Sequence, residues 1–380
     1  MKVALPVGVS RLDRYLLSEM ALPFLFGVGA FVSLVMTIGS FFELVRLMVE
    51  SGLPLETAAR IFGLRLWGFI VLTFPMSMLL TALLAYSRLS ADSEIVALKA
   101  CGVSASRLIA PALVMSLCVT ALTFVFNEQI VPSANYEANV TLARALNQDA
   151  PSFKRSNITY QEFEDRQGPD GNFSRQLARI LYAKNYDEGV LQEMTVLDFT
   201  QDNLTQIVKA QRGTWLPKQQ KWLFEQGRIY TIDSAGSYRN ILQFDKQQVN
   251  ISHRPIDWIE GSKRRPEEMT IRELGRFIQL SADAGQDTRS LWVQYYQKFS
   301  FPFVCVAFAL VGATLGMRPQ RTTRAVGLGL CILIIFGYYV FSVLAGAWGQ
   351  LGYLTPIVAA WLPIFVTVGV GGILLWRVSR

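Results

Sequence analysis

The sequence predicts an α-helical membrane protein with six transmembrane helices and an all-β domain inserted between the third and the fourth. The 380 residues are 51% hydrophobic and only 17% charged, whereas soluble domains carry about 25% charged residues. Six apolar runs are each long enough to cross a hydrocarbon core of ~30 Å, which takes about 20 helical residues. A long polar segment between the third and fourth runs alternates apolar and polar residues, a pattern typical of β-strands.

The apolar runs and their flanking charges predict the topology. We place the six spans at residues 21–42, 61–85, 108–131, 299–317, 325–347 and 354–376. Lys and Arg cluster before the first run, between the second and third, after the fourth and at the C-terminal end. These positions share one side of the membrane if every run spans, so both ends of the chain are expected in the cytoplasm. The net charge of +7 is therefore interpreted as a topology signal and not as a surface for nucleic acid.

The expected organisation has three segments. Residues 1–133 hold the first three spans, 134–298 form the inserted domain with flanking helices, and 299–380 hold the last three spans. Period-two alternation between turn residues predicts antiparallel strands that bury one face, as in a sandwich or jelly roll. Thr270 and Glu273 have the spacing of a capping box, which predicts the start of a returning helix.

The pattern leaves open which face of the strand at residues 191–199 is buried. We take Leu197 as the inward-facing residue, which would contact acyl chains if the domain carries lipid. A slip of one residue would exchange the two faces and turn Val196 inward instead. Both residues are therefore candidates for a lipid path.

Motifs for nucleotide or covalent chemistry are missing from the sequence. It has no GxxxxGKS or GxxxxGKT loop and no CxxC pair, and His253 is its single histidine. A Walker A site and a Cys- or His-based metal or catalytic site are therefore not predicted. No acidic residue or histidine lies near the middle of a span, which disfavours a proton-coupled transporter. We predict no catalytic residue, metal or cofactor in this chain.

Charged residues at the far-side ends of the first two spans have two interpretations. Glu43 and Arg46 end the first span, and Arg60 and Arg65 begin the second. They can be snorkelling side chains or a helix-surface ion pair. Alternatively, Arg46, Arg60 and Arg65 form a cationic rim for an anionic lipid headgroup, because the planar donor fork of Arg suits phosphate.

The loop at residues 90–102 between the second and third spans is expected to be a short capped helix. Ser90 is a suitable N-cap, Glu94 places negative charge at the positive helix end, and Gly102 suits the position after the C-cap. Ile95 and Leu98 are three residues apart and give the helix an apolar stripe. A passive connector between two spans needs none of these features.

Four motifs give the chain a resemblance to a known family. They are DRYLLSE before the first span, SEIVALKACGVS before the third, QKFSFP entering the fourth, and PIVAAWLP in the sixth. The chain resembles the LptF/LptG permease family over nearly its whole length. Its ACG sequence is similar to F-type members and its DRY sequence to G-type members, so both subtypes stay open.

The resemblance implies a place in lipopolysaccharide export. Such permeases are multi-pass proteins of the bacterial inner membrane, with a β-jellyroll insertion in the periplasm. The implied partners are a second LptF/LptG-type subunit, an LptB-like ATPase dimer that holds ATP and Mg, and an LptC/LptA-like periplasmic bridge. The implied substrate is lipopolysaccharide or a similar glycolipid. The alternative function is a membrane-anchored periplasmic binding or scaffold protein without transport.

The resemblance also assigns a role to the loop. It implies that residues 90–102 are the coupling helix that docks on the ATPase, with Glu94 at its acidic position. Ser93, Ile95, Leu98 and Gly102 would complete this ATPase-coupling site.

The predicted topology can be tested by cysteine labelling. In a variant whose other cysteines are replaced, Gly171→Cys should react with a membrane-impermeant thiol reagent added outside the inner membrane. Native Cys101 alone, the matched control, should react only after the membrane is disrupted. The opposite labelling pattern would contradict the orientation.

Overall fold

The structure is a computed structural model that describes residues 11–146, 155–167, 173–187, 190–199, 206–216, 221–232, 238–249, 264–283, 285–317 and 324–379. The chain divides into two compact units, a helical unit (Met1–Leu142 with Arg289–Arg380) and a β unit (Ala143–Thr288). The insertion is shorter at both ends than the expected 134–298. The third span continues beyond its apolar run, and the helix before residue 299 packs within the helical unit.

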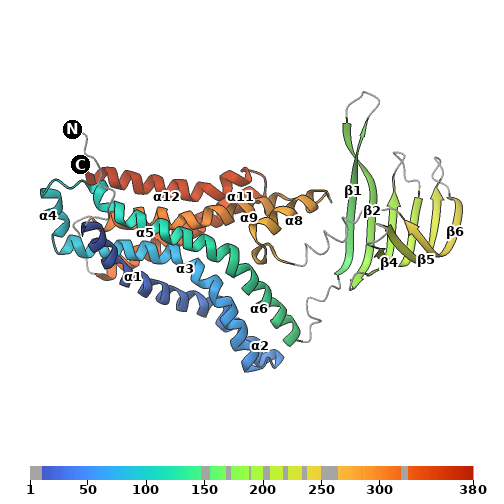
Figure 1. Ribbon diagram of the computed structural model, residues 1–380, viewed down its shortest axis with the longest axis horizontal. Coiled ribbons are helices and arrows are strands. Elements are labelled where there is room, and N and C mark those ends of the chain that lie inside the picture. The colour runs from blue at the N-terminus through green and yellow to red at the C-terminus, as the bar shows by residue number, and fades with distance from the viewer. Residues whose placement is uncertain are drawn as a thin grey trace. The chain divides into compact units, whose positions relative to one another are not determined.

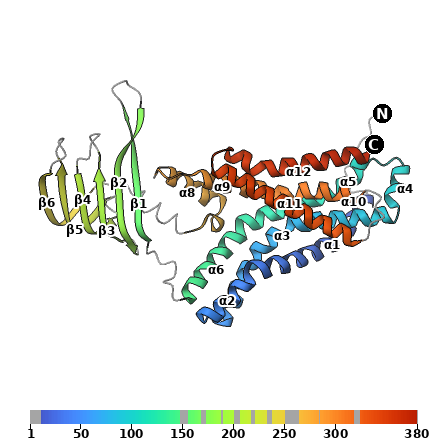
Figure 2. The same ribbon diagram turned by 180° about the vertical axis from the view of Figure 1, so that it is seen from behind.

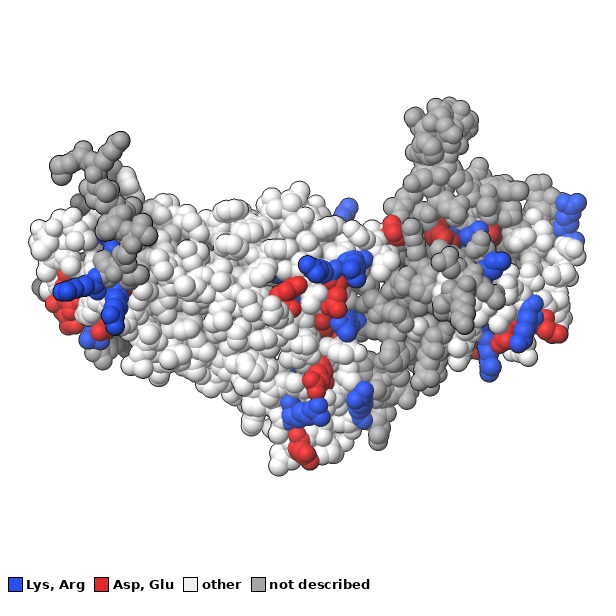
Figure 3. All heavy atoms as spheres, viewed as in Figure 1, with Lys and Arg blue, Asp and Glu red and all other residues white. Residues whose placement is uncertain are grey.

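The six expected spans are confirmed. Among the described residues, six helices are long and apolar enough to cross a membrane, with mean hydropathy between 2.0 and 2.4: Arg11–Ser51, Leu55–Ala91, Ala105–Ala145, Arg289–Gly316, Gly327–Gln350 and Pro356–Ser379. Charged side chains gather at the two ends of the helical unit on the face shown in Figure 3, and other residues form the surface between them. This distribution fits a bilayer around the uncharged middle.

Several spans are built from more than one helical segment (Figure 1). The segments are α1 (Arg11–Met36), a π-helical turn (Thr37–Phe41) and α2 (Phe42–Ser51); α3 (Leu55–Ala91); α5 (Ala105–Val125), a π-helical turn (Phe126–Ile130) and α6 (Val131–Ala145); α9 (Arg289–Ser300), a 3₁₀ turn (Phe301–Phe303) and α10 (Val304–Gly316); α11 (Arg324–Gln350); and α12 (Pro356–Ser379). A short helix, α4 (Glu94–Ala100), connects α3 to α5.

Two glycines allow α10 to pack directly on α3. A Cβ on Gly312 would lie 2.6 Å from the carbonyl oxygen of Leu79, and one on Gly316 would lie 2.8 Å from that of Leu83. Both distances are too short for any side chain, so the spacing Gly-x-x-x-Gly lets the two backbones approach closely. The side chains around this contact, including Phe308, are fully buried.

The β unit contains one antiparallel sheet (Figure 2). Its strands are β1 (Arg155–Gln167), β2 (Phe173–Asp187), β3 (Val190–Asp198), β4 (Gln206–Leu216), β5 (Lys221–Ile232) and β6 (Tyr238–Val249), in the order β1-β2-β3-β4-β5-β6. The inserted all-β domain is thus confirmed. A jelly roll pairs strands that are distant in sequence, whereas each described strand pairs with its sequence neighbour. The short connections explain this difference, because two residues between β2 and β3 permit only a hairpin.

The buried face of the sheet corrects the expected strand register. Val196 is 3% exposed and lies in the core cluster with Trp222 and Phe224. It stands opposite Leu181 and Val208, which are also buried. Leu197 points to the other face, so the choice of Leu197 as the inward residue was wrong. The structure has the alternative register, with Val196 inward on the face that holds the core cluster.

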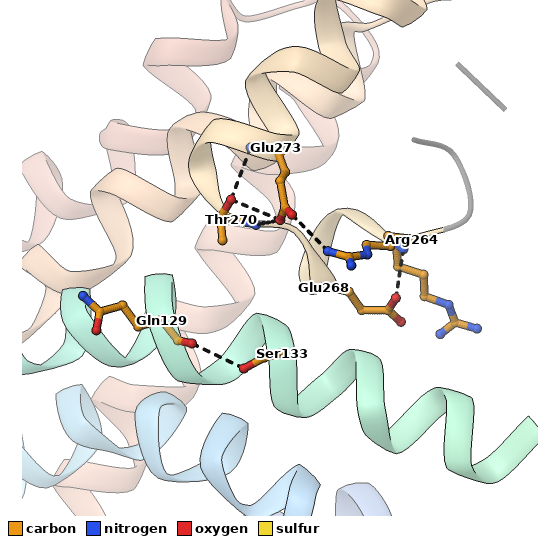
Figure 4. Close-up of polar contacts among 7 residues, drawn as sticks. Gln129, Ser133, Arg264, Glu268, Thr270 and Glu273 are labelled. Atoms are coloured by element: carbon orange, nitrogen blue, oxygen red, sulfur yellow. Dashed lines mark hydrogen bonds and ion pairs between the residues drawn. The ribbon is translucent and has the colours of Figure 1, made fainter. Parts of the chain in front are cut away.

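The predicted capping box is confirmed at the start of α8 (Ile271–Asp283). The backbone N–H of Thr270 donates to the Glu273 carboxylate at 2.8 Å, and the backbone N–H of Glu273 donates to the Thr270 hydroxyl at 3.2 Å (Figure 4). Glu273 also accepts a hydrogen bond from Arg264 at 3.0 Å. In the helical unit, the Ser133 hydroxyl bonds the carbonyl oxygen of Gln129 at 3.3 Å within its own helix.

The close packing of α3 on α10 can be tested with one added methyl group. We expect Gly312→Ala to lower the free energy of unfolding by about 1–3 kcal/mol, since the methyl group meets backbone atoms that cannot move aside. Thermal unfolding of the purified protein in detergent measures the change. The control is Gly369→Ala in α12, where no atom lies within 4 Å of the new Cβ. Equal unfolding temperatures for the two variants would contradict the packing argument.

Candidate functional site

The short helix α4 starts later than the sequence suggests. Helix α3 continues through Ala91, so Ser90 lies inside α3 and the expectation that it caps the loop helix was wrong. Burial explains the difference, because Tyr86 and Leu89 on α3 are almost fully buried and hold the helix together past Ser90. Ser93 occupies the N-cap position with a φ of 60° and makes no side-chain cap bond.

The C-terminal end of α4 follows the prediction. Gly102 has a φ of 85°, which favours glycine because a Cβ is strained in this region. The N–H of Gly102 donates to the carbonyl oxygen of Lys99 at 2.9 Å, and that of Val103 donates to Leu98 at 3.1 Å. This pair of bonds is a Schellman motif. Ser104 then caps α5 by accepting a bond from the N–H of Arg107 at 3.3 Å.

The apolar stripe of α4 contacts the chain's own core. Ile95 is 3% exposed and belongs to the buried cluster of the helical unit, and Leu98 is partly buried against the same cluster. Ile95 therefore packs within this chain, because a seven-residue helix uses this face to stay attached, and a role of Ile95 and Leu98 in ATPase coupling stays a prediction. The exposed face instead carries Val96, which is 60% exposed, with Ala97 and Ala100.

Glu94 is held by a tyrosine from the first helix. The Tyr15 hydroxyl donates to both carboxylate oxygens of Glu94, at 3.1 and 3.2 Å. Two ion pairs lie in the same end of the unit. The Arg107 guanidinium binds both oxygens of Asp13, at 2.6 and 2.8 Å, and Arg88 binds Glu19 at 2.7 Å. We call these three contacts the α1 bracket, because each one joins α1 to α3, α4 or α5.

The α1 bracket gives a physical role to the DRYLLSE motif, whose residues Asp13, Tyr15 and Glu19 make its contacts. Pattern analysis missed these contacts because the partners are 69 to 94 residues apart. A usable signal was the presence of acidic residues before the first span and basic residues around the loop, on one side of the membrane. The amine of Lys99 adds a fourth connection by donating to the carbonyl oxygen of Val378 at 3.0 Å.

At the opposite end of the helical unit, each of the three rim arginines has a carboxylate partner. Arg65 binds Glu43 at 2.8 Å and also donates to Ser40, Arg60 binds Glu137 at 2.6 Å, and Arg46 binds Glu50 at 2.9 Å. Glu43 therefore pairs across helices with Arg65, and the expected surface pair with Arg46 is not formed. A role of these arginines in headgroup binding stays a prediction, and it requires an anion to compete with three carboxylates.

Within the described ranges, no three His, Cys, Asp or Glu side chains lie close enough together to hold a metal ion. His253 lies outside the described residues. Cys305 and Cys331 are buried in the helical unit, and Cys101 and Cys118 are exposed.

Comparison with known proteins agrees over nearly the whole chain. A family model described as "Lipopolysaccharide export system permease LptF/LptG" matches residues 14–377. A curated relative, "Lipopolysaccharide export system permease protein LptG" of Haemophilus influenzae, is 21% identical over 382 residues. The alignment covers 98% of this chain and 99% of the relative.

The α1 bracket should stabilise the helical unit more than an exposed ion pair does. Arg107→Ala leaves Asp13, which is only 18% exposed, without its bidentate partner. We expect a loss of about 1.5–3 kcal/mol in the free energy of unfolding, measured by thermal unfolding in detergent. Arg46→Ala is the control, because its pair with Glu50 is exposed and is worth about 0.3–0.5 kcal/mol. A loss at Arg107 no larger than at Arg46 would refute a structural role for the bracket.

Proposed function

This chain belongs to the LptF/LptG family of lipopolysaccharide export permeases, and we propose that it is the membrane subunit of an ABC-type transporter. The family match and the six apolar helices make it a multi-pass inner-membrane transport protein and not an enzyme. In the proposed function, it extracts lipopolysaccharide from the inner membrane and passes it to a periplasmic bridge. ATP is hydrolysed by a separate LptB-like ATPase dimer, which supplies the ATP and Mg site.

The observation that carries the proposal is the way α4 is held. This seven-residue helix lies at the end of the unit that we expect in the cytoplasm. It is fixed by Ile95, which packs in the core, by the bond of Glu94 to Tyr15 of α1, and by the bond of Lys99 to Val378 of α12. A force applied to its exposed face would therefore move α1 and α12 together with it. A membrane-anchored scaffold needs no such element, whereas a transporter driven by a separate ATPase does.

We further propose that the ATPase contacts the exposed face of α4. Val96, Ala97 and Ala100 form a small apolar surface there, and a short apolar helix face suits a groove on a partner. Glu94 acts within this chain by tying α4 to α1, and Ser93 and Gly102 set the two ends of the helix. Hydrolysis would thus be transmitted to the first span through the α1 bracket.

The lipid route is proposed from the exposure of the spans. In the most apolar stretch of the spans Arg11–Ser51 and Gly327–Gln350, only 17% of the residues are buried within the chain. The corresponding share for the span Leu55–Ala91 is 72%. The apolar surfaces of α1 and α11 are therefore available to lipid and to a second LptF/LptG-type subunit. We propose that lipopolysaccharide enters between α1 of one subunit and α11 of the other, and that an LptC/LptA-like partner receives it from the β unit.

Separate variants can test the contact with the ATPase and the coupling of ATP hydrolysis to lipid transport. Val96→Asp places a charge on the apolar face of α4, and burying it should reduce co-purification with the ATPase at least tenfold. Ser106→Asp adds the same charge at an exposed site outside α4 and should leave the complex intact. Tyr15→Phe should keep the complex but lower the lipid released per ATP hydrolysed, because it breaks only the bond to Glu94.

Co-purification from membranes and lipid release from proteoliposomes are the two measurements. If Val96→Asp binds the ATPase and exports lipid at the wild-type rate, α4 is not the coupling helix. If no ATPase co-purifies with the wild-type chain, the scaffold function replaces the transporter.

A further inference from the structure

The outer face of the sheet carries a polar groove that the proposed function does not use. The groove has a volume of about 850 Å³ and crosses five strands, β2 to β6. One row of directly paired residues runs along it. The row is Tyr182, Thr195, Lys209, Arg228 and Gln243, each opposite the next in the strand register.

Two cations in this row lie side by side. Lys209 on β4 and Arg228 on β5 are register partners, and both are exposed. Like charges in directly opposite positions destabilise an antiparallel pair. Neither residue has an ion-pair partner among the residues that the structure describes. By contrast, Lys184 binds Glu193 at 2.7 Å and Lys246 binds Glu225 at 3.1 Å. This cation pair lies inside the groove, whose lining also includes Lys184 and the carboxylates of Glu193 and Asp245.

Two non-glycine residues with positive φ values line the groove. Glu193 on β3 and Gln226 on β5 line it and have φ values of 48° and 51°. At each of them two residues that are not buried separate consecutive buried positions, while the pairing with the neighbouring strands keeps its register. Non-glycine residues in this region are strained, and such strain persists where the surrounding structure requires it.

The side chains of the groove fit a sugar that carries phosphate. The fork of Arg228 and the ammonium of Lys209 can bind phosphate oxygens. The amide of Gln243 and the hydroxyl of Thr195 can exchange hydrogen bonds with sugar hydroxyls, since both groups donate and accept. The rings of Tyr182 and Tyr230 offer apolar faces for sugar C–H groups and polar ends for hydroxyls. Aliphatic side chains that could contact an acyl chain lie in the neighbouring row, at Leu197, Ile207 and Ile241, and these three do not line the groove.

We propose that this groove binds the phosphorylated saccharide head of a glycolipid. The inference rests on the proposed function for the source of the ligand, because an exported lipopolysaccharide brings such a head to the β unit. The opposite, apolar face of the sheet is closed by its own core around Trp222 and Phe224. The groove would therefore hold the head of the molecule on the outer face of the strands.

The test is a binding titration on the full chain purified in detergent, without the ATPase. The probe is the deacylated, phosphorylated core oligosaccharide of lipopolysaccharide. We expect it to bind at least tenfold more tightly than the same oligosaccharide after phosphatase treatment, and more tightly than inorganic phosphate. Equal binding of inorganic phosphate or of the dephosphorylated sugar would overturn the proposal, as would the absence of binding.

Variants then locate the site. Lys209→Ala/Arg228→Ala should weaken binding at least tenfold. The matched control Lys221→Ala/Arg239→Ala removes the same two charges from exposed strand positions outside the groove and should change binding less than twofold. Arg228→Lys keeps the charge without the fork, and we expect an intermediate loss. Wild-type binding by the groove variant would refute the assignment.

Two further measurements separate binding from folding and from transport. The groove variant should unfold at the wild-type temperature or above it, because it removes a repulsive pair. A fall in unfolding temperature together with wild-type binding by Arg228→Lys would overturn the proposal in favour of a structural role. If the oligosaccharide binds but no ATPase co-purifies, the assignment of the groove as a saccharide site is supported and the proposed transport function is refuted. If export continues without saccharide binding, only the groove assignment fails.

Discussion

The close contact between α3 and α10 is the constraint on which the helical unit depends. Gly312 and Gly316 let the backbone of α10 lie against the carbonyl oxygens of α3, and the buried clusters of the unit form around these two helices. In a bilayer, apolar side chains gain little by leaving lipid, so tight packing of small residues has to fix the arrangement. With α3 and α10 in the middle, α1 and α11 are left at the surface, where a lipid or a second subunit can reach them.

The two ends of the helical unit use charge in different ways. At the α4 end, Asp13, Tyr15 and Glu19 of α1 contact α5, α4 and α3, so polar bonds add to the apolar cluster that these helices share. At the other end, Arg46, Arg60 and Arg65 are each neutralised by a carboxylate. The excess of positive charge that indicates the topology in the sequence therefore coexists with extensive pairing in the folded chain.

The features that could be predicted from the sequence are those set by local patterns. Hydropathy placed the six spans, alternation placed the strands, and the capping box at Thr270 and the Gly102 terminus followed from neighbouring residues. The features that were missed depend on distant residues. Burial of Tyr86 and Leu89 carried α3 past Ser90, the core attracted Ile95, and pairing with two other strands decided that Val196 turns inward. The α1 bracket joins residues 69 to 94 positions apart, which no local pattern reports.

The order of the elements along the chain has a consequence for biogenesis. Helix α3 leaves the ribosome early, but α10, which fills the surface between Leu79 and Tyr86, is synthesised only after all six strands. Each strand pairs with its neighbour in sequence, so the sheet can form by successive hairpins while the helical unit is still incomplete. During that interval the surface of α3 that α10 later covers faces lipid or another membrane protein. Insertion of the last three helices is then the step that closes the core, and a chain stalled before it would present α3 to the quality-control proteases of the membrane.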